Sequence, residues 1–466
     1  MRRRFVLGAA LAAVAAAATS TATPATPAGF KTTRPAQLVA TAPGVVIDPI
    51  LSAGDTLPEG YQMTGIPDGL GAFQTGKSLQ LFMNHELEGP PVPPGVGARV
   101  SHLTIDRDTH RVLAGSYAFT GLEGFTRFCS STLATLDGTH WYFTGEEDTQ
   151  VGALTPDPSD GMGRDGSSIA LNADTGQWTE TKHFGHLLHE NVVPVKGLSQ
   201  AFFLTTDDDF RGDPDHNSYL YAYIAPTWDG AIAGTEGSLY VWKARKGDST
   251  SDVTKGQTLA GRFVPISQAD NATGATLEAA SREAGGFKFT RLEDAAVARG
   301  QDGRVYFDDT GRLGAETVKG RLYRLDIDST HPTRASVTLL LDGDAGDGIV
   351  NPDNVDTSAT AVVIQEDRNS EHRGSEVAGG YSRVLVYDIA TEALRTVARV
   401  NTPSTLKPGT WESSGVINAQ GLLGRGWWLI DVQAHSTSAP QPGPTLVPDS
   451  STGEDGQLLA VRIPGT

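Results

Sequence analysis

The chain has 466 residues, and its 55 Asp and Glu against 37 Lys and Arg give a formal net charge of −18 at pH 7. Such a surface repels nucleic acid and attracts cations, which argues against a nucleic-acid-binding function. The only cysteine, Cys129, cannot form a disulfide within the chain. Its possible roles are packing, reactivity or metal binding.

The N-terminus reads MRRRFVLGAALAAVAAAATSTATPATPA, in which three arginines precede an apolar run from Phe5 to about Ala18. The run is too short to span a membrane and small residues follow it, so it predicts a secretory signal. The segment RRRFVL also fits the twin-arginine pattern, which we favour over an ordinary secretory signal. We therefore expect residues 1–29 to be a twin-arginine signal peptide, and the protein to be secreted or periplasmic without a membrane span.

Residues 35–466 are expected to form one domain, because no Pro- or Ser-rich linker divides them. Helix-period apolar stripes are almost absent, and short runs of alternating apolar residues recur between turn signals. These runs are SLQLFMNHE (78–86), HWYFTGEE (140–147), SQAFFLTTDDD (199–209), GSLYVWKA (237–244), GRVYFDDT (303–310), GRLYRLDID (320–328), ATAVVIQED (359–367), SRVLVYDIA (382–390) and GRGWWLIDVQ (424–433). They predict an all-β protein built from many short antiparallel strands, as a sandwich, barrel or propeller.

Three of the runs, at 238–244, 321–327 and 383–389, look like one structural unit repeated. Their spacing of roughly 60–80 residues favours the blades of a β-propeller with long loops between strands.

Five of the runs end in carboxylates. In a propeller the innermost strands are parallel around a channel, so acidic strand ends would meet at one mouth. Carboxylates brought together must bind cations or become protonated. Solvated hairpin tips would also end in Asp and Glu, but five such runs together favour a metal site.

Several short segments, in matching chain order, resemble the PhoX-type alkaline phosphatases. These segments are MNHE (83–86), Cys129 followed by GEED (145–148), HFGHLLHEN (183–191), TTDDDF…YLY (205–221), FTRLED (289–294), NPDNV…IQED (351–367), WESSG (411–415) and DVQAH (431–435). The resemblance implies a six-bladed propeller with iron (Fe³⁺) and calcium (Ca²⁺) in its channel. It also implies a phosphatase that hydrolyses phosphate monoesters after twin-arginine export, and for this reaction we expect metal-assisted in-line attack.

By the same resemblance, Cys129, Glu190 and Glu293 hold the iron. A thiolate is a strong ligand for iron, and metal coordination keeps it deprotonated. Arg291 precedes Glu293 by two residues, so on a strand both side chains lie on one face. A guanidinium there suits bidentate capture of a phosphate, although a simple Arg–Glu salt bridge would give the same pattern. We expect Arg291, Cys129 and Glu293 to be catalytic.

The remaining acidic residues of these segments suit calcium, which takes six to eight oxygen ligands in flexible geometry. The candidates are Glu86, Glu146, Glu147, Asp208, Asp209, Asp353, Asn354, Glu366 and Asp367. The loop RGDPDHNSY (211–219) is a candidate for a peripheral calcium ion.

Three departures from the family pattern concern the substrate pocket, and one is RLED (291–294), where in the family a proline follows the arginine. Phe128 stands where the family commonly has asparagine, and SSTLATLDGTHWYF replaces a glycine-rich segment with a tryptophan. HExxH, GxSxG and P-loop motifs are absent.

The expected partners are small phosphate esters, and the expected state is a monomer. The alternatives are a calcium-dependent propeller hydrolase of a lactone or phosphodiester, and a non-catalytic calcium-stabilised binding propeller; neither requires a thiolate.

Overall fold

The computed structural model describes residues 29–87, 97–148, 166–209, 217–269, 271–368, 380–435 and 454–466. The expected signal peptide and most of the loop at 211–219 lie outside these ranges. Every strand pairing between the strands named below is antiparallel. None of the helices in the described ranges has the length and apolar character needed to cross a bilayer.

The described residues form five sheets. The first contains β3 (Pro67–Thr75), β4 (Ser78–His85), β5 (Arg99–Asp106) and β6 (Val112–Phe119). The second contains β7 (Thr132–Leu136), β8 (Thr139–Gly145), β9 (Ser168–Asn172) and β10 (Trp178–Glu180).

The third sheet has nine strands in the order β11-β12-β13-β14-β15-β19-β18-β17-β16. Its strands are β11 (His189–Pro194), β12 (Ala201–Asp207), β13 (Leu220–Ala225), β14 (Ser238–Ala244), β15 (Thr258–Ile266), β16 (Leu292–Val297), β17 (Arg304–Asp309), β18 (Arg321–Ile327) and β19 (Arg334–Asp342).

The last two sheets each recruit a strand from near the N-terminus. One has the order β20 (Pro352–Thr357), β21 (Ala361–Glu366), β22 (Arg383–Asp388), β23 (Leu394–Val400) and β1 (Leu38–Ala40). The other has the order β24 (Trp411–Asn418), β25 (Trp427–Ala434), β26 (Asp455–Arg462) and β2 (Val46–Ser52). The pairing of β2 with β26 ties the two ends of the described chain together.

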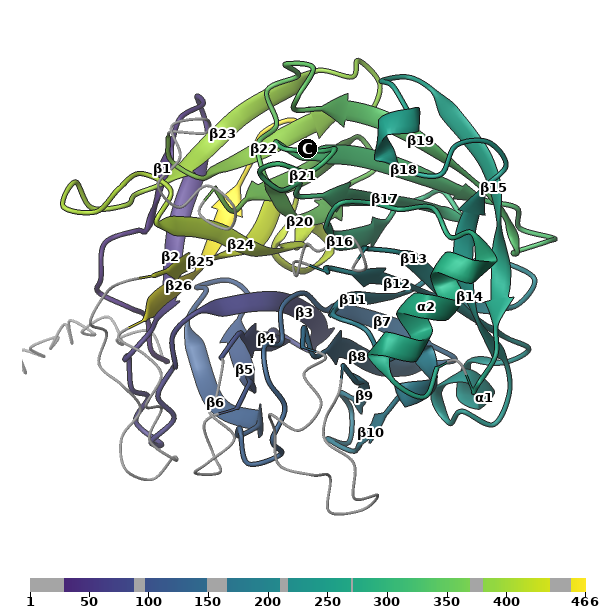
Figure 1. Cartoon of the computed structure of the whole chain (residues 1–466). Helices are drawn as coiled ribbons and strands as arrows, with labels where there is room; N and C mark the ends of the chain where they lie inside the picture. Colours follow the sequence, from purple (N-terminus) through teal and green to yellow (C-terminus); the bar gives the residue numbers. More distant parts are fainter. Residues whose placement is uncertain are drawn as a thin grey trace, which may run out of the picture.

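Six strands form the inner layer of this arrangement, and we call them the inner strands: β3, β7, β11, β16, β20 and β24. Each contacts the next, and β24 contacts β3, so that they close a cycle. In Figure 1 their labels surround the centre of the molecule, with the other strands outside them. The expectation of an all-β, propeller-like protein is confirmed. The sheets number five rather than six, because the nine-stranded sheet carries two inner strands, β11 and β16, at its edges.

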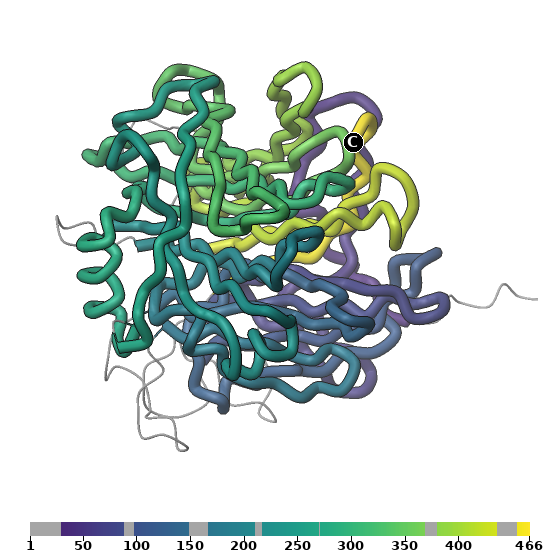
Figure 2. Tube along the Cα trace, turned by 90° about the vertical axis from the view of Figure 1, so that its right-hand side faces the viewer, coloured from purple at the N-terminus to yellow at the C-terminus, as the bar shows by residue number. Residues whose placement is uncertain are grey.

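The hydrophobic core is divided into six clusters, each made by two neighbouring groups of strands. One cluster, for example, joins Phe82 of the first sheet to Phe128, which lies just before β7, and to Ile169 of the second sheet. Another fills the interior of the nine-stranded sheet between its β11–β15 and β16–β19 halves. The side view in Figure 2 shows that neighbouring segments of the chain lie close together. Burial between adjacent sheets, rather than one central core, therefore stabilises the fold.

The nine alternating runs all form strands, namely β4, β8, β12, β14, β17, β18, β21, β22 and β25. The proposed repeat of three equivalent runs is wrong in one member. β18 and β22 are third from the channel, whereas β14 is fourth. The sequence patterns also gave no sign of helix α2 (Gly274–Ala284), which the Thr273 side chain caps and which ends at left-handed Gly285. Two shorter helices are α1 (Trp228–Ile232) and α3 (Gln420–Leu423).

Candidate metal centre

The inner strands begin in a common way. In β3, Pro67 pairs with His85 of the neighbouring strand, and the register then shifts before Leu70. The same irregularity follows the first residue of β11, β16 and β20, and in β24 it follows the first three paired residues. Before β7, an isolated bridge between Phe128 and Glu146 takes its place. Such bulges re-aim side chains, and here they recur around the channel.

The residue that follows the first paired residue is acidic in five of these six places and is the cysteine in the sixth. We call this set the first-strand ring: Asp68, Cys129, Glu190, Glu293, Asp353 and Glu412. Cys129 therefore occupies a position that the other inner strands give to a carboxylate.

A second set comes from the neighbouring strands, which are antiparallel and so end where the inner strands begin. We call the residues just after their paired residues the second-strand ring: Glu86, Glu147, Asp208, Thr310, Asp367 and His435. The acidic runs predicted from the sequence thus belong to the second strands. The expectation that they end the innermost strands is wrong, although both sets meet at one mouth.

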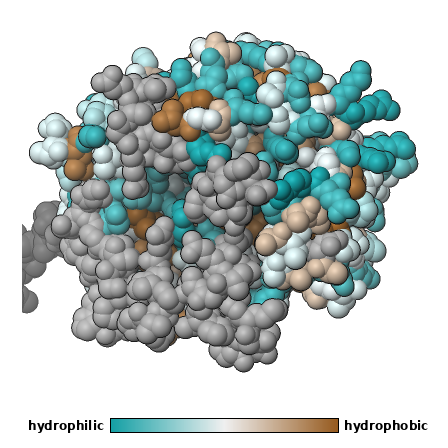
Figure 3. Space-filling view, viewed as in Figure 1, coloured by the Kyte–Doolittle hydropathy of each residue, from teal (hydrophilic) through white to brown (hydrophobic). Residues whose placement is uncertain are grey.

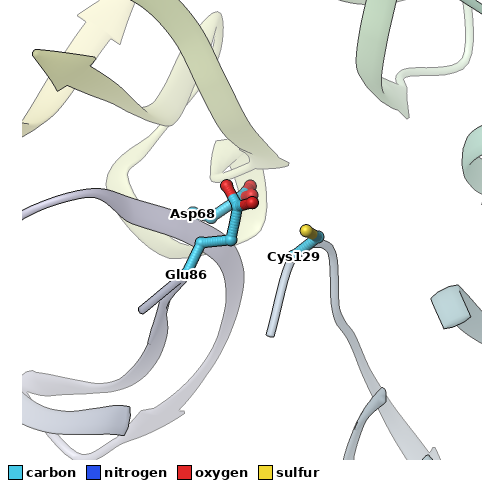
Figure 4. A group of neighbouring side chains, drawn as sticks. All are labelled: Asp68, Glu86 and Cys129. Carbon is cyan, nitrogen blue, oxygen red and sulfur yellow. The ribbon is translucent and has the colours of Figure 1, made fainter. Parts of the chain in front are cut away.

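Within the two rings, four overlapping groups have ligand atoms within 4.8 Å of one another. They are Asp68–Glu86–Cys129, Cys129–Glu147–Glu190, Glu190–Glu293–Asp353 and Asp353–Asp367–Glu412. In Figure 4 the carboxylates of Asp68 and Glu86 lie together, and the sulfur of Cys129 faces them across a gap. Shared members connect the four groups into one continuous series of potential ligands.

Cys129 is buried among these acids, and its Sγ–H donates to Glu147 Oε2 at 2.8 Å. Burial raises the pKa of the Cys129 thiol well above its ordinary value, and the charges of Glu147 and Glu86 raise it further. The preceding Phe128 is fully buried in the cluster between the first two sheets. Since adjacent residues of an extended chain point to opposite sides, this packing turns Cys129 toward the channel.

The carboxylates of the first-strand ring share one electrostatic condition. Burial, and then neighbouring carboxylates, raise the pKa well above the ordinary value for each of Asp68, Glu190, Glu293, Asp353 and Glu412. Acids held this close must take up protons or cations. Around Cys129 the donors are one sulfur and several carboxylates, which fits iron, whereas Asp353, Asp367 and Glu412 offer only oxygen, which fits calcium.

Two arginines reach these rings. Arg291 donates to both oxygens of Asp208, with Nε to Oδ1 at 2.8 Å, and its Nη2 lies 3.3 Å from Glu293 Oε1. Arg291 and Glu293 thus lie on one side, as their spacing predicts, and they form the ion pair that the alternative interpretation expects. Arg127, two residues before Cys129, was missed by the sequence reasoning. Its Nη2 lies 3.1 Å from Glu147 and 3.4 Å from Glu86.

Three of the six residues that lie two positions before a residue of the first-strand ring also have a strained backbone. Ile66, Arg127 and Asn351 have φ of 41°, 46° and 46°, and they are three of six described non-glycine residues with positive φ. Each immediately precedes the first paired residue of an inner-strand start. Strained backbone of this kind persists where the surrounding structure fixes it, and it is common at functional sites.

Several predicted ligands lie beside the four groups rather than in them. Glu146 accepts hydrogen bonds from the backbone N–H groups of Thr126 and Ser167. Asp209 borders a small cavity with Glu278. A separate contact involves Glu366, which is fully buried and paired with Arg368 and Arg383.

Asn354 lies closer to the centre, where its Nδ2 donates to Ser130 Oγ at 2.7 Å and approaches Asp68 Oδ1 at 3.4 Å. Conversely, Asp68 and Glu412 belong to the groups but were not predicted. Asp68 lies in a PDG turn signal, and Glu412 in the segment WESSG. The signal that would have found them is their shared place as the second residue of an inner strand.

On the face shown in Figure 3, the described surface is largely hydrophilic. Few large apolar side chains of the described residues are exposed. No family model matches the chain, and neither does any curated protein. Solved structures do match. PhoX from Pseudomonas fluorescens, in complex with vanadate, a transition state analogue, is 15% identical with a TM-score of 0.63, covering 93% of this chain and 98% of that one. The chain therefore shares the fold of that protein.

Two other solved structures are less similar. The PQQ-bound aldose sugar dehydrogenase from Streptomyces coelicolor is 10% identical, with a TM-score of 0.37 over 90% of this chain and 98% of that one. A glycosyl hydrolase from Bacteroides ovatus is 10% identical, with a TM-score of 0.36 over 72% and 87%. At these scores neither supports an inference about this chain.

Proposed function

We propose that this protein is a secreted, metal-dependent phosphatase that hydrolyses phosphate monoesters. The observation that carries the proposal is the placement of Cys129 at a ring position that five inner strands give to carboxylates, within two of the four ligand groups. A calcium-binding propeller has no use for a thiol at that point. A centre that holds iron beside calcium would need a thiol there, because a soft sulfur selects the transition metal.

The fold supports this proposal by its six inner strands and six interleaved core clusters. We interpret the nine-stranded sheet as two blades joined through β15, so that residues 35–466 form a single six-bladed propeller. Proteins of this fold include PhoX from Pseudomonas fluorescens, which was solved with vanadate, a transition state analogue.

The proposed chemistry assigns each side chain a task. Iron and calcium, when bound, would supply the positive charge that polarises a phosphoryl group and activates the attacking oxygen. Cys129, Glu190 and Glu293 would hold iron, and the other ring carboxylates calcium. Glu147 Oε2 already accepts the thiol hydrogen of Cys129, so it is placed to receive that proton as the thiolate forms.

Arg291 would bind the phosphate. Its planar guanidinium now holds Asp208 through two nitrogens, which is the geometry that also fits two phosphate oxygens. It is 8% exposed, so a phosphate bound there would be largely desolvated. Desolvation strengthens the attraction between the guanidinium and the charge that develops in the transition state.

The decisive test is metal analysis together with hydrolysis assays on protein exported by its native route. We expect iron and calcium in the protein, and hydrolysis of 4-nitrophenyl phosphate that exceeds hydrolysis of bis(4-nitrophenyl) phosphate and of a lactone. Preferred hydrolysis of the diester or lactone by protein with calcium alone would support the alternative hydrolase. Calcium without any hydrolysis would support the binding propeller.

Export is tested separately through the N-terminal arginines, which lie outside the described residues. Replacing Arg2 and Arg3 by lysine should leave folded protein inside the cell, because the twin-arginine route requires that pair. Unchanged secretion of this variant would mean an ordinary secretory signal.

A further inference from the structure

Asp431 is a buried acid that none of the four ligand groups contains. It lies in β25, and in the described structure its side chain is fully buried with both carboxylate oxygens lacking a hydrogen-bond partner. Within the described ranges, Asp431 forms no ion pair with a Lys or Arg. A buried carboxylate without a donor or a cation is strongly unfavourable, so this side chain must either hold a proton or bind a cation.

The neighbour of Asp431 is Asp68 of the first-strand ring. Asp431 faces the stretch of β24 where the register shifts, between the pairs Ser413–Val432 and Val416–Ile430. A Cβ added to Gly415 in that stretch would lie 2.5 Å from the Asp68 carbonyl oxygen and 3.2 Å from Asp431 Oδ1. Glycine thus lets β24 pass close to Asp68 and leaves Asp431 aimed at the same place.

Two amide side chains add to this constellation. Asn354 Nδ2 and Gln433 Nε2 approach the two oxygens of Asp68 at 3.4 Å and 3.3 Å. Nδ2 also donates to Ser130 Oγ at 2.7 Å, and Nε2 to Glu86 Oε2 at 2.9 Å. These bonds fix which end of each amide is nitrogen. The opposite ends, Asn354 Oδ1 and Gln433 Oε1, are buried acceptors without a partner.

We propose that Asp431 and Asp68 bind a calcium ion, with the side-chain oxygens of the two amides completing the site. Two carboxylates and neutral oxygens, without sulfur or imidazole, form a donor set for a hard divalent cation. Asp68 would connect this site to the rings, because it also belongs to the group with Glu86 and Cys129. The site is a separate cation position and does not depend on phosphatase activity.

The position of the site indicates its role. Asp68 lies in β3 of the first sheet, Asn354 in β20, and Asp431 in β25 of the sheet that contains the C-terminal strand. This is also the sheet in which β2 pairs with β26. A calcium ion there would join the first and last sheets where the cycle of inner strands closes, and would stabilise the folded state by mass action.

The test compares wild type with Asp431→Asn, which keeps the size of the side chain and removes its charge. Calcium and iron per chain are measured by elemental analysis, and melting temperature is measured with calcium and with a chelator. We expect the variant to lose one calcium per chain, to keep its iron, and to show a smaller rise in melting temperature on calcium addition. In chelator it should be at least as stable as wild type, because one of two adjacent like charges is gone.

The matched control is Asp294→Asn, at a buried acid whose oxygens accept from Asn191, Val355 and Ala295. It should keep the wild-type calcium count. An unchanged calcium count in Asp431→Asn would overturn the proposal, and would mean that the two acids share a proton instead. Failure of Asp431→Asn to fold in chelator would also overturn it. Iron content and hydrolysis are scored independently, so a wrong function would not alter this result.

Discussion

Two inner strands, β7 and β16, are preceded by an arginine that lies two residues before the ring residue. The two arginines differ in their contacts and in their exposure. Near β7 the ring residue is Cys129, and Arg127 contacts Glu147 and Glu86. At β16 the ring residue is Glu293, and the arginine two positions before it is paired with Asp208 and with Glu293 itself. The side chain of Arg127 is 22% exposed, and that of Arg291 only 8%.

The difference shows that the fold determines where the ring residues lie, and that the residue types determine which donor atoms they offer. Phe128 and Leu292 occupy the same place before the ring residue, and both are fully buried. Each therefore turns its successor toward the channel. The repeat places either a thiol or a carboxylate at the next position. One side of the mouth therefore has a soft sulfur donor among its carboxylates, and the other side has oxygen donors only.

The largest effect is expected where this contrast is removed. Cys129→Ser replaces the sulfur with a poorly acidic hydroxyl of similar size. We expect loss of iron, loss of visible absorption from the charge transfer of a ferric thiolate, and a fall in phosphatase kcat on the order of 10³-fold, as for other single groups of a catalytic unit. Metal analysis, absorption spectra and steady-state kinetics would measure the three together.

Cys129→Asp is the informative companion, because it gives this position the residue type found at the other inner strands. It should fold and retain calcium, yet lack the visible absorption and most of the activity. Retained iron, colour and activity in Cys129→Ser would contradict the assignment of the thiol as a ligand.

The next effect distinguishes the two arginines. Arg291→Lys loses the planar fork that binds two oxygens at once, and we expect kcat/KM for phosphate esters to fall about 10²-fold. Arg127→Lys should cost about tenfold, since its partly exposed charge is screened by solvent. Arg321→Lys is the control: its side chain is 8% exposed, like that of Arg291, but it pairs with Asp342 and should leave kinetics unchanged. Equal losses in Arg291→Lys and Arg127→Lys would remove the distinction between the two arginines.

A smaller effect is expected to distinguish two residues that are adjacent in the sequence, Glu366 and Asp367. Glu366 is held by Arg368 and Arg383, whereas the next residue, Asp367, belongs to a ligand group. Glu366→Gln should lower the free energy of unfolding by about 2 kcal/mol and keep the calcium count, because it removes one partner of a largely buried ion pair. Asp367→Asn should do the reverse, losing calcium with little change in stability in chelator. Denaturant unfolding and metal analysis would check both, and the same calcium loss in both variants would contradict this division.

The sequence revealed the strands and most of the acids, since alternation and turn residues are local signals. It could not assign members of adjacent acid pairs, because which one faces the channel depends on strand register. Glu147 and Asp208 lie in or beside the groups, while Glu146 is held by backbone amides. Asp68 escaped notice because its place follows from a bulge that only the paired strands define.

The smallest expected effect concerns pH. In the first-strand ring, burial raises the carboxyl pKa values above those of the unfolded chain, as it does for the nearby Asp294, whose pKa rises to about 7. The metal-free folded state then binds more protons than the unfolded state from about pH 4 upward, so its stability falls as pH rises through the raised pKa values. We expect the melting temperature in chelator to drop by several degrees between about pH 5 and pH 8. Calcium should flatten this decline, because bound cations replace the protons. A melting temperature in chelator that rises with pH would mean that these acids are already ionised and paired, and that the ring does not need metal.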